Sequence, residues 1–130
     1  MIKISNKHAY KIFDALKRLE SSDNEFSINA LNGIANQKEL FETPFDEASK
    51  YKDHILDLYV KKNSDGSVIN DVSGFVYNSV TAKQEFLSKL GTYMSQEHEY
   101  EVIEIERKDL PESIKSVHNI SSWILYCVEK

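Results

Sequence analysis

Residues 43–61 read TPFDEASKYKDHILDLYVK and contain the strongest helix signal in the chain. Thr43 is suited to cap a helix, Pro44 to occupy its first position, and Asp46 to place a negative charge near its N-terminus. Apolar side chains follow at three- and four-residue spacing, which is typical of a helix with one buried face. The pattern predicts a helix over residues 44–61.

Two further helix patterns precede this segment. Residues 6–20 have apolar side chains on one face and follow Ser5, which is a good N-cap. Residues 26–41 are ambiguous, because Ser27 suits a helix N-terminus while the Asn-Gly pair at 32–33 is typical of a hairpin turn. A short, interrupted helix is preferred there, and a hairpin stays open as the alternative.

Strand and helix patterns alternate after a turn-forming NSDG sequence at residues 63–66. A capping box that begins at Thr81 marks the next helix, and the Asp-Leu-Pro-Glu sequence at 109–112 marks a short one. The last apolar run is shorter than a buried helix needs, which favours a central strand. The predicted elements are a strand at 67–77 with a bulge at Gly74, a helix at 82–96, a strand at 100–106, a short helix capped by Asp109, and a strand at 123–128.

These elements predict a single α+β domain over residues 1–130. Its helical N-terminal half is followed by a small three-stranded sheet with covering helices, parallel or antiparallel. A chain of 130 residues suits one hydrophobic core. No apolar run is long enough for a membrane helix, and the start MIKISNKHAY lacks a secretory signal. With its single cysteine, which allows no internal disulfide, the chain is expected to be cytoplasmic.

The charge of the chain is uneven. The net charge is −5, and residues 66–130 carry six basic against ten acidic side chains, a balance of −4. Fourteen of the sixteen basic residues are lysine, which lacks the planar guanidinium that reads guanine edges. The abundance of Lys, Asn and Ile is typical of AT-rich genomes, including those of bacteria and phages.

Residues 97–109, EHEYEVIEIERKD, concentrate this negative charge. Alternate residues of a strand share a face, so Glu97, Glu99 and Glu101 would lie on one side and Tyr100 on the other. A solvated edge strand is the commonest role of such a charge run, and a partner-binding surface is the next. A catalytic or metal site has the least support. The candidate partner-binding residues are Glu97, Glu99, Tyr100, Glu101, Glu104 and Glu106.

Other reactive side chains show no pattern specific to an active site. His54 lies near Asp57, and His118 precedes the serines at 121–122, but local pairs of this kind more often form caps and turns. Cys127 lies in an apolar run and is expected in the core. The glycines do not cluster into a phosphate-binding loop. We therefore expect no catalytic, cofactor-binding or metal-ligating residues.

A basic face on the first predicted helix supports an alternative function. Three helices followed by a hairpin loosely match the order of a winged helix-turn-helix. Acidic residues on the second and third helices oppose this interpretation, as does the small counterion-release gain of an acidic domain. The alternative nucleic-acid-binding residues are Lys3, Lys7, Lys11 and Arg18.

The sequence thus favours a small intracellular protein without catalytic activity that binds another protein. The expected partner has a basic surface, and the binding surface is acidic and bears Tyr100. An inhibitor, immunity or accessory factor of the kind that phages and bacteria encode would suit this chemistry. The alternative is a transcription-associated or nucleic-acid-binding regulator that uses the basic face of residues 3–18. No cofactor is expected in either case.

Overall fold

The computed structural model describes residues 1–21, 25–71 and 74–130. Within them, the chain forms short strands, α-helices and two 3-10 helices. In chain order these are β1 (Ile2–Ser5), α1 (Asn6–Glu20), α2 (Ile28–Tyr59), β2 (Asn70–Asp71), β3 (Gly74–Phe75), α3 (Val80–Ser95), β4 (Glu97–Tyr100), η1 (Arg107–Asp109), η2 (Glu112–Ser116) and α4 (Ile120–Cys127).

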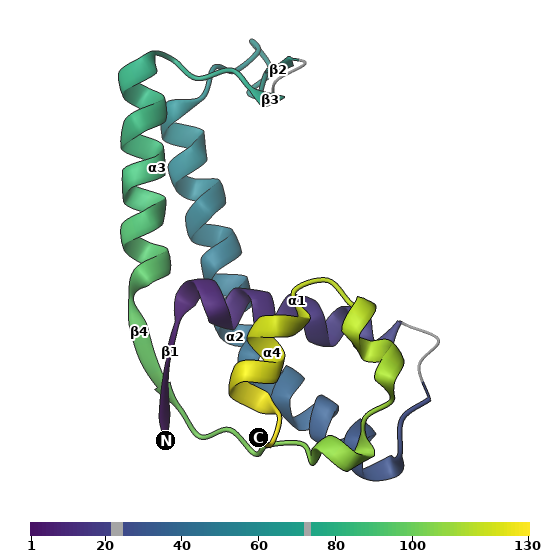
Figure 1. The fold of residues 1–130 in the computed structure, drawn as a ribbon. Coiled ribbons are helices and arrows are strands. Elements are labelled where there is room, and N and C mark those ends of the chain that lie inside the picture. The colour runs from purple at the N-terminus through teal and green to yellow at the C-terminus, as the bar shows by residue number, and fades with distance from the viewer. Residues whose placement is uncertain (22–24, 72–73) are drawn as a thin grey trace.

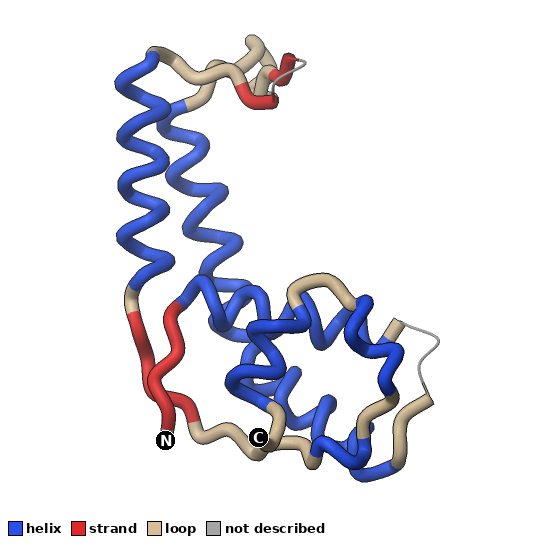
Figure 2. Tube along the Cα trace, in the orientation of Figure 1, coloured by secondary structure: helices blue, strands red, loops and turns tan. Residues whose placement is uncertain are grey.

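The molecule consists of a helical body and a projecting arm (Figure 1). α1, the first half of α2 and α4 form the body, while the second half of α2 and α3 lie side by side in the arm. Figure 2 shows strands at both ends of the arm: β1 and β4 at its base, β2 and β3 at its tip. Both strand pairs are antiparallel. The expected α+β class with a helical N-terminal half is confirmed.

The prediction for α1 is confirmed in its range and its cap. The Ser5 side-chain oxygen accepts a hydrogen bond from the His8 backbone N–H at 3.2 Å. One face of the helix is buried in the body, where its side chains form much of the core. The core residues of α1 are Ala9, Ile12, Phe13, Ala15, Leu16 and Leu19.

The prediction of two separate helices within residues 26–61 is wrong, because the single helix α2 runs without a break from Ile28 to Tyr59. Ser27 caps it as expected and accepts from the Ala30 N–H at 3.2 Å. Thr43 is not a cap, and Pro44 lies inside the helix. A proline cannot donate to the carbonyl one turn back, and such positions bend helices. The two halves of α2 run in different directions in Figure 1, and Pro44 inside the helix is the type of residue that causes such a bend.

Gly33 allows another part of the chain to pack closely on α2. A Cβ atom at this position would lie 2.6 Å from Cγ1 of Ile105, which is closer than side-chain atoms approach each other. Ile105 follows β4 and is almost fully buried. The Asn-Gly pair at 32–33 therefore marks a crossing point within a helix, and the hairpin alternative is wrong.

The C-terminal segments differ most from the prediction. β4 ends at Tyr100, and the expected strand at 100–106 reduces to one parallel bridge between Ile105 and Val128. The expected strand at 123–128 lies mostly in α4. Only one side of this helix is covered, since Trp123 is fully buried and Leu125 is 54% exposed. A short apolar run does not distinguish such a helix from a buried strand.

Smaller corrections concern helix starts and the tip of the arm. Ser79, not Thr81, caps α3 and accepts from the Ala82 N–H at 3.0 Å. Asp109 lies inside η1, and the expected short helix is the 3-10 helix η2. Where a single strand was expected at 67–77, the structure has the small β2–β3 pair. Residues 72–73 lie outside the described part of the chain. Gly74 begins β3 with a φ of 114°, which favours glycine.

Gln37 lies at the centre of the body core and is only 1% exposed. Its side-chain Nε2 donates to the carbonyl oxygens of Ile103, at 2.8 Å, and Cys127, at 2.9 Å. Its Oε1 accepts from the indole Nε1 of Trp123 at 2.8 Å. One amide thus connects α2 to the segment after β4 and to α4, and its buried polar atoms are satisfied.

The arm has its own cluster of buried side chains. Phe86 of α3 packs among Ile55, Leu56 and Val60 at the end of α2. Nearer the body, Tyr51 of α2 and Tyr93 of α3 stack with their ring centroids 4.3 Å apart. Among the described residues, no helix is both long enough and apolar enough to span a membrane.

Replacing Gln37 by Leu should strongly destabilise the protein. The variant keeps a similar volume but leaves the Trp123 N–H and the Ile103 carbonyl without the Gln37 partner, and each such group costs about 1–3 kcal/mol. The Cys127 carbonyl keeps the hydrogen bond from the Ile105 N–H at 3.0 Å. We expect the free energy of unfolding, measured in urea, to fall by about 3 kcal/mol or more. The control Asn36→Leu, at the exposed neighbouring position, should change it by less than about 1 kcal/mol. Similar small losses in both variants would contradict the importance of the network.

Candidate functional site

The acidic strip consists of Glu97, Glu99, Glu101, Glu104 and Glu106, and all five side chains are exposed. In the β1–β4 pair, Glu97 lies opposite Ser5 and Glu99 opposite Lys3. Successive residues of a strand point to opposite faces, so Glu97 and Glu99 lie on the face opposite to Tyr100. They share that face with their cross-strand partners, Ser5 and Lys3. The predicted alternation therefore holds within β4.

Tyr100 does not belong to this surface. It is 9% exposed, and its ring centroid lies 5.1 Å from that of Phe41 in the core. Burial, with smaller contributions from Glu47 and Tyr93, raises the pKa of the Tyr100 hydroxyl. The expectation that Tyr100 serves as a surface anchor is therefore wrong.

Ile103, instead of Tyr100, is the exposed apolar side chain among the glutamates. It is 68% exposed and lies between Glu101 and Glu104. The chain leaves the strand after Tyr100, so the alternation of faces no longer applies to residues 101–106. Strand alternation puts both Ile103 and Ile105 on the side of the first three glutamates, but Ile103 is exposed and Ile105 is buried, so the sequence pattern could not single out Ile103.

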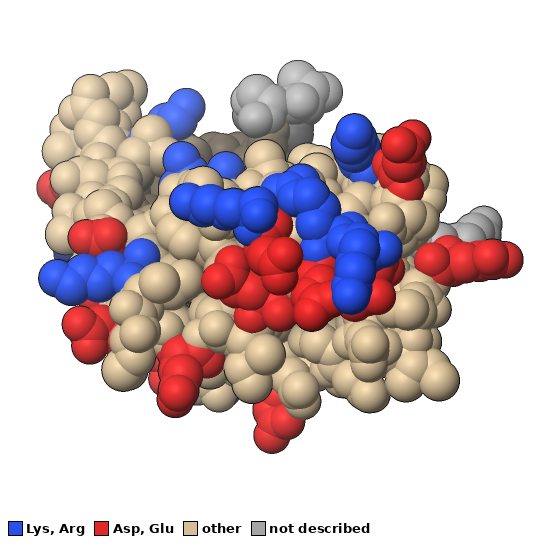
Figure 3. Space-filling view, turned by 60° about the horizontal axis from the view of Figure 1, so that its bottom comes forward, with Lys and Arg blue, Asp and Glu red and all other residues tan. Residues whose placement is uncertain are grey.

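Basic side chains border the acidic strip. Lys108 forms an ion pair with Glu106 at 3.0 Å, and Lys3 lies opposite Glu99 in the strand pair. Figure 3 shows acidic side chains gathered beside a line of basic ones on the underside of the body. The strip is thus a negative surface with a basic border.

The alternative basic residues do not form one uniform surface. Lys7, Lys11 and Arg18 lie on α1, whereas Lys3 lies on β1 beside the acidic strip. Asp14 interrupts the basic face of α1 and pairs with Arg18 at 3.1 Å. Its carboxylate also accepts a hydrogen bond from the Asn119 side chain at 2.9 Å, which ties this face to the start of α4.

A histidine–serine contact exists, but not the one suggested by the sequence. Nδ1 of His8 lies 3.2 Å from Oγ of Ser122, and the His8 ring lies 5.3 Å from the ring of Tyr126. Burial, Lys11 and Lys7 lower the pKa of His8, which favours the neutral imidazole. Ser122 is buried, and no described carboxylate is hydrogen-bonded to His8. The contact therefore joins α1 to α4 and lacks the third group that orients a catalytic base.

The remaining candidates show no catalytic arrangement. His54 is exposed on α2, and Asp57 pairs with Lys62 at 3.0 Å. His118 is exposed just before α4. Within residues 1–21, 25–71 and 74–130, no group of three His, Cys, Asp or Glu side chains is arranged to hold a metal ion.

Comparison with known proteins does not add a functional assignment. No protein-family model matches the chain, and no match is found among curated proteins or solved structures. The candidate site is therefore defined by exposure and charge alone.

Cys127 is fully buried in the body core, as expected from its apolar surroundings. Burial, with Glu104 as a second cause, raises the pKa of its thiol to about 12. Thiolate is the reactive form of cysteine, so this side chain is poorly suited to nucleophilic or redox chemistry in the folded protein.

The Cys127 thiol should react at least about 100-fold more slowly with an aromatic disulfide reagent at pH 8 in the folded chain than in urea. Its pKa rises from an ordinary value of 9.0 to about 12 on folding. Between these values the unfolded chain binds fewer protons, so the free energy of unfolding falls as pH rises.

The variant Cys127→Ala lacks this group and should lose less stability than the natural chain between pH 8 and about pH 10. Urea unfolding at both pH values measures the difference. Parallel losses in the two chains, or rapid labelling of the folded protein, would contradict the buried, protonated thiol.

Proposed function

We propose that this chain is a small intracellular, non-enzymatic protein-binding factor whose acidic strip recognises a basic surface on another protein. One observation carries the proposal: five exposed carboxylates within ten consecutive residues surround Ile103, which is 68% exposed. An apolar contact within a charged rim is a common arrangement of protein interfaces.

The charge of the strip suits recognition of a basic partner. Complementary charges accelerate encounter and exclude partners of the wrong sign, while the apolar contact supplies binding free energy. The five glutamates of the strip account for the balance of −4 in residues 66–130, because the rest of that half carries five acidic against six basic side chains. The negative potential of this half is therefore concentrated at the strip. This chemistry fits an inhibitor, immunity or accessory factor of the kind that phages and bacteria encode. Its target would be an enzyme with a basic nucleic-acid channel.

The triple variant Glu101→Lys, Ile103→Ser, Glu104→Lys should abolish partner capture. It removes the apolar contact and reverses two charges at exposed positions, so the fold should be retained. Proteins retained from a lysate of the source cells by the immobilised natural chain and by the variant are compared by mass spectrometry, and urea unfolding checks stability.

The matched control is Glu39→Lys, Glu42→Lys, Leu58→Ser, which makes the same changes at exposed positions of α2. It should retain the same proteins as the natural chain. Equal recovery by the triple variant, or equal loss in the control, would remove the acidic strip as the binding surface.

A nucleic-acid-binding regulator is the second candidate. The observation in its favour is that Lys7 and Lys11 lie one turn apart near the N-terminus of α1, which places two positive charges at this end of the helix. The negative net charge and the Asp14–Arg18 ion pair oppose it.

We expect the natural chain to pass through a heparin column without retention at low salt, because an acidic chain gains little from counterion release. The variant Lys7→Glu, Lys11→Glu should behave in the same way. Retention that this variant loses would instead support nucleic-acid binding, provided that the control Lys50→Glu, Lys52→Glu keeps it.

A further inference from the structure

One edge of β1 is free for pairing among the described residues. The Asn6 N–H donates to the Gln96 carbonyl at 2.9 Å, in register with the β1–β4 ladder. Hydrogen-bonded and non-hydrogen-bonded pairs alternate along an antiparallel ladder, so the backbone groups of Ile2 and Ile4 point toward β4. Those of Lys3 therefore point to the other edge, where no described strand pairs with β1.

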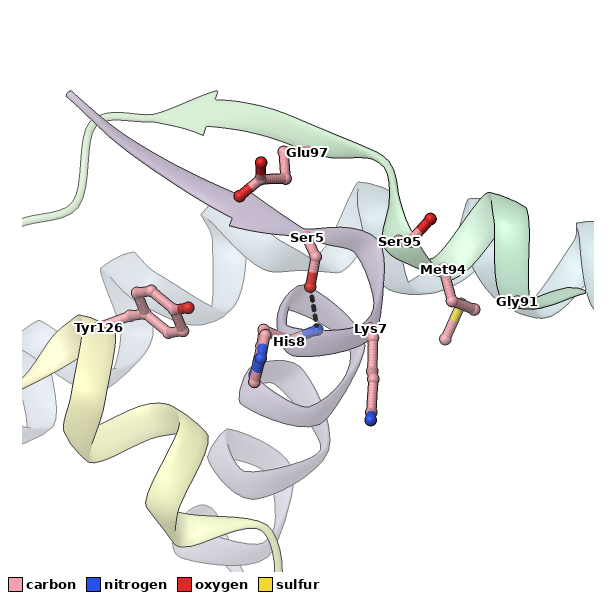
Figure 4. A pocket seen from close by; sticks show the side chains of 8 residues that line it. All are labelled: Ser5, Lys7, His8, Gly91, Met94, Ser95, Glu97 and Tyr126. Carbon is pink, nitrogen blue, oxygen red and sulfur yellow. Dashed lines mark hydrogen bonds between the residues drawn. The ribbon is translucent and has the colours of Figure 1, made fainter.

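Two adjoining depressions lie beside β1 and α4, and Tyr126 of α4 lines both. The first, of about 520 Å³, covers the first turn of α1 and is also lined by Ser5 and His8. Figure 4 shows the Tyr126 ring pointing from α4 toward His8. The second, of about 700 Å³, lies between Ile2 and Leu125. The two depressions share Tyr126 and are together called the groove, which has residues of β1 and of α4 in its lining. Its first part also reaches Met94 of α3 and Glu97 of β4.

The chemistry of the groove is apolar in its middle and acidic at one end. Ile2 is 40% exposed and Leu125 54% exposed, so both offer apolar surface. Glu104 and Glu129 line the second depression together with Lys130, which leaves a negative balance there. An extended segment with an apolar side chain followed by Lys or Arg would complement this surface.

We propose that this groove binds an extended segment of another protein, which adds as a third strand at the free edge of β1 and places a Lys or Arg side chain near Glu104 and Glu129. Strand addition supplies main-chain hydrogen bonds, while the groove selects side chains. A two-stranded sheet is marginal alone, so β1 and β4 gain stability from a third strand. The groove is a second surface beyond the acidic strip, although Glu104 belongs to both.

The test uses a library of random seven-residue peptides fused to a carrier protein and selected on the immobilised chain. The most strongly retained peptide is then made with a fluorescein label, and its Kd is measured by fluorescence anisotropy. We expect selected peptides to combine β-branched residues with Lys or Arg. A library that yields no retained peptide, or one without these features, would overturn the proposal.

Lys3→Pro and Lys3→Ala separate backbone from side-chain recognition. Proline removes an N–H that points away from β4, which an edge strand tolerates, whereas alanine keeps it. We expect Lys3→Pro to raise the Kd at least about tenfold and Lys3→Ala to leave it within about twofold. Equal Kd values for the two variants would overturn strand addition.

Variants elsewhere in the groove keep the test decisive if Lys3→Pro does not fold. Leu125→Ser and Glu129→Lys lie at exposed positions, and each should raise the Kd about tenfold. Glu101→Lys with Ile103→Ser changes only the acidic strip and should leave peptide binding intact, so the two surfaces fail separately. A dimer in size-exclusion chromatography that Leu125→Ser dissociates would show that a second copy occupies the groove, and would overturn the proposal.

Discussion

The side-chain amide of Gln37 connects three parts of the body: α2, the segment after β4, and α4. Residues 101–106 have no regular strand or helix, so their buried carbonyls need other partners. The Ile103 carbonyl accepts a hydrogen bond from the Gln37 side chain. The Ile105 N–H donates to the Cys127 carbonyl at 3.0 Å, and the Ile105 carbonyl accepts from the Glu129 N–H at 2.9 Å. The same bonds hold the backbone of the acidic strip against the core while its side chains stay in solvent.

Local signals made parts of the fold predictable. Ser5 and the apolar spacing of residues 6–20 contain all that α1 needs, because the cap and the buried face lie within the same segment. The prediction of a helix start at Pro44 was wrong for a physical reason. The missing N–H of proline suits both a helix start and a kink, and only the packing of α2 distinguishes the two. The prediction of a strand at 123–128 was wrong because a short helix and a buried strand share the same apolar composition.

The candidate site was predictable in charge but not in its apolar contact. Five glutamates in a short run are too costly to desolvate, so their exposure followed from the sequence. Whether Tyr100 or Ile103 faces solvent depends on the pairing of β4 with β1 and on where that pairing stops. The His8–Ser122 contact likewise joins residues from opposite ends of the chain, and the sequence around each residue does not indicate its partner.

The separation of the two buried clusters has a consequence for motion. α2 contributes to both, but the arm cluster has few fully buried members and shares none with the larger body cluster. Opening free energies within a protein follow such differences in burial, so the arm should unravel as a subglobal unit while the body stays intact. Amide hydrogens of α2 would then exchange at two distinct rates, with the boundary near Pro44, and the base of the arm would separate a less stable arm from a more stable body.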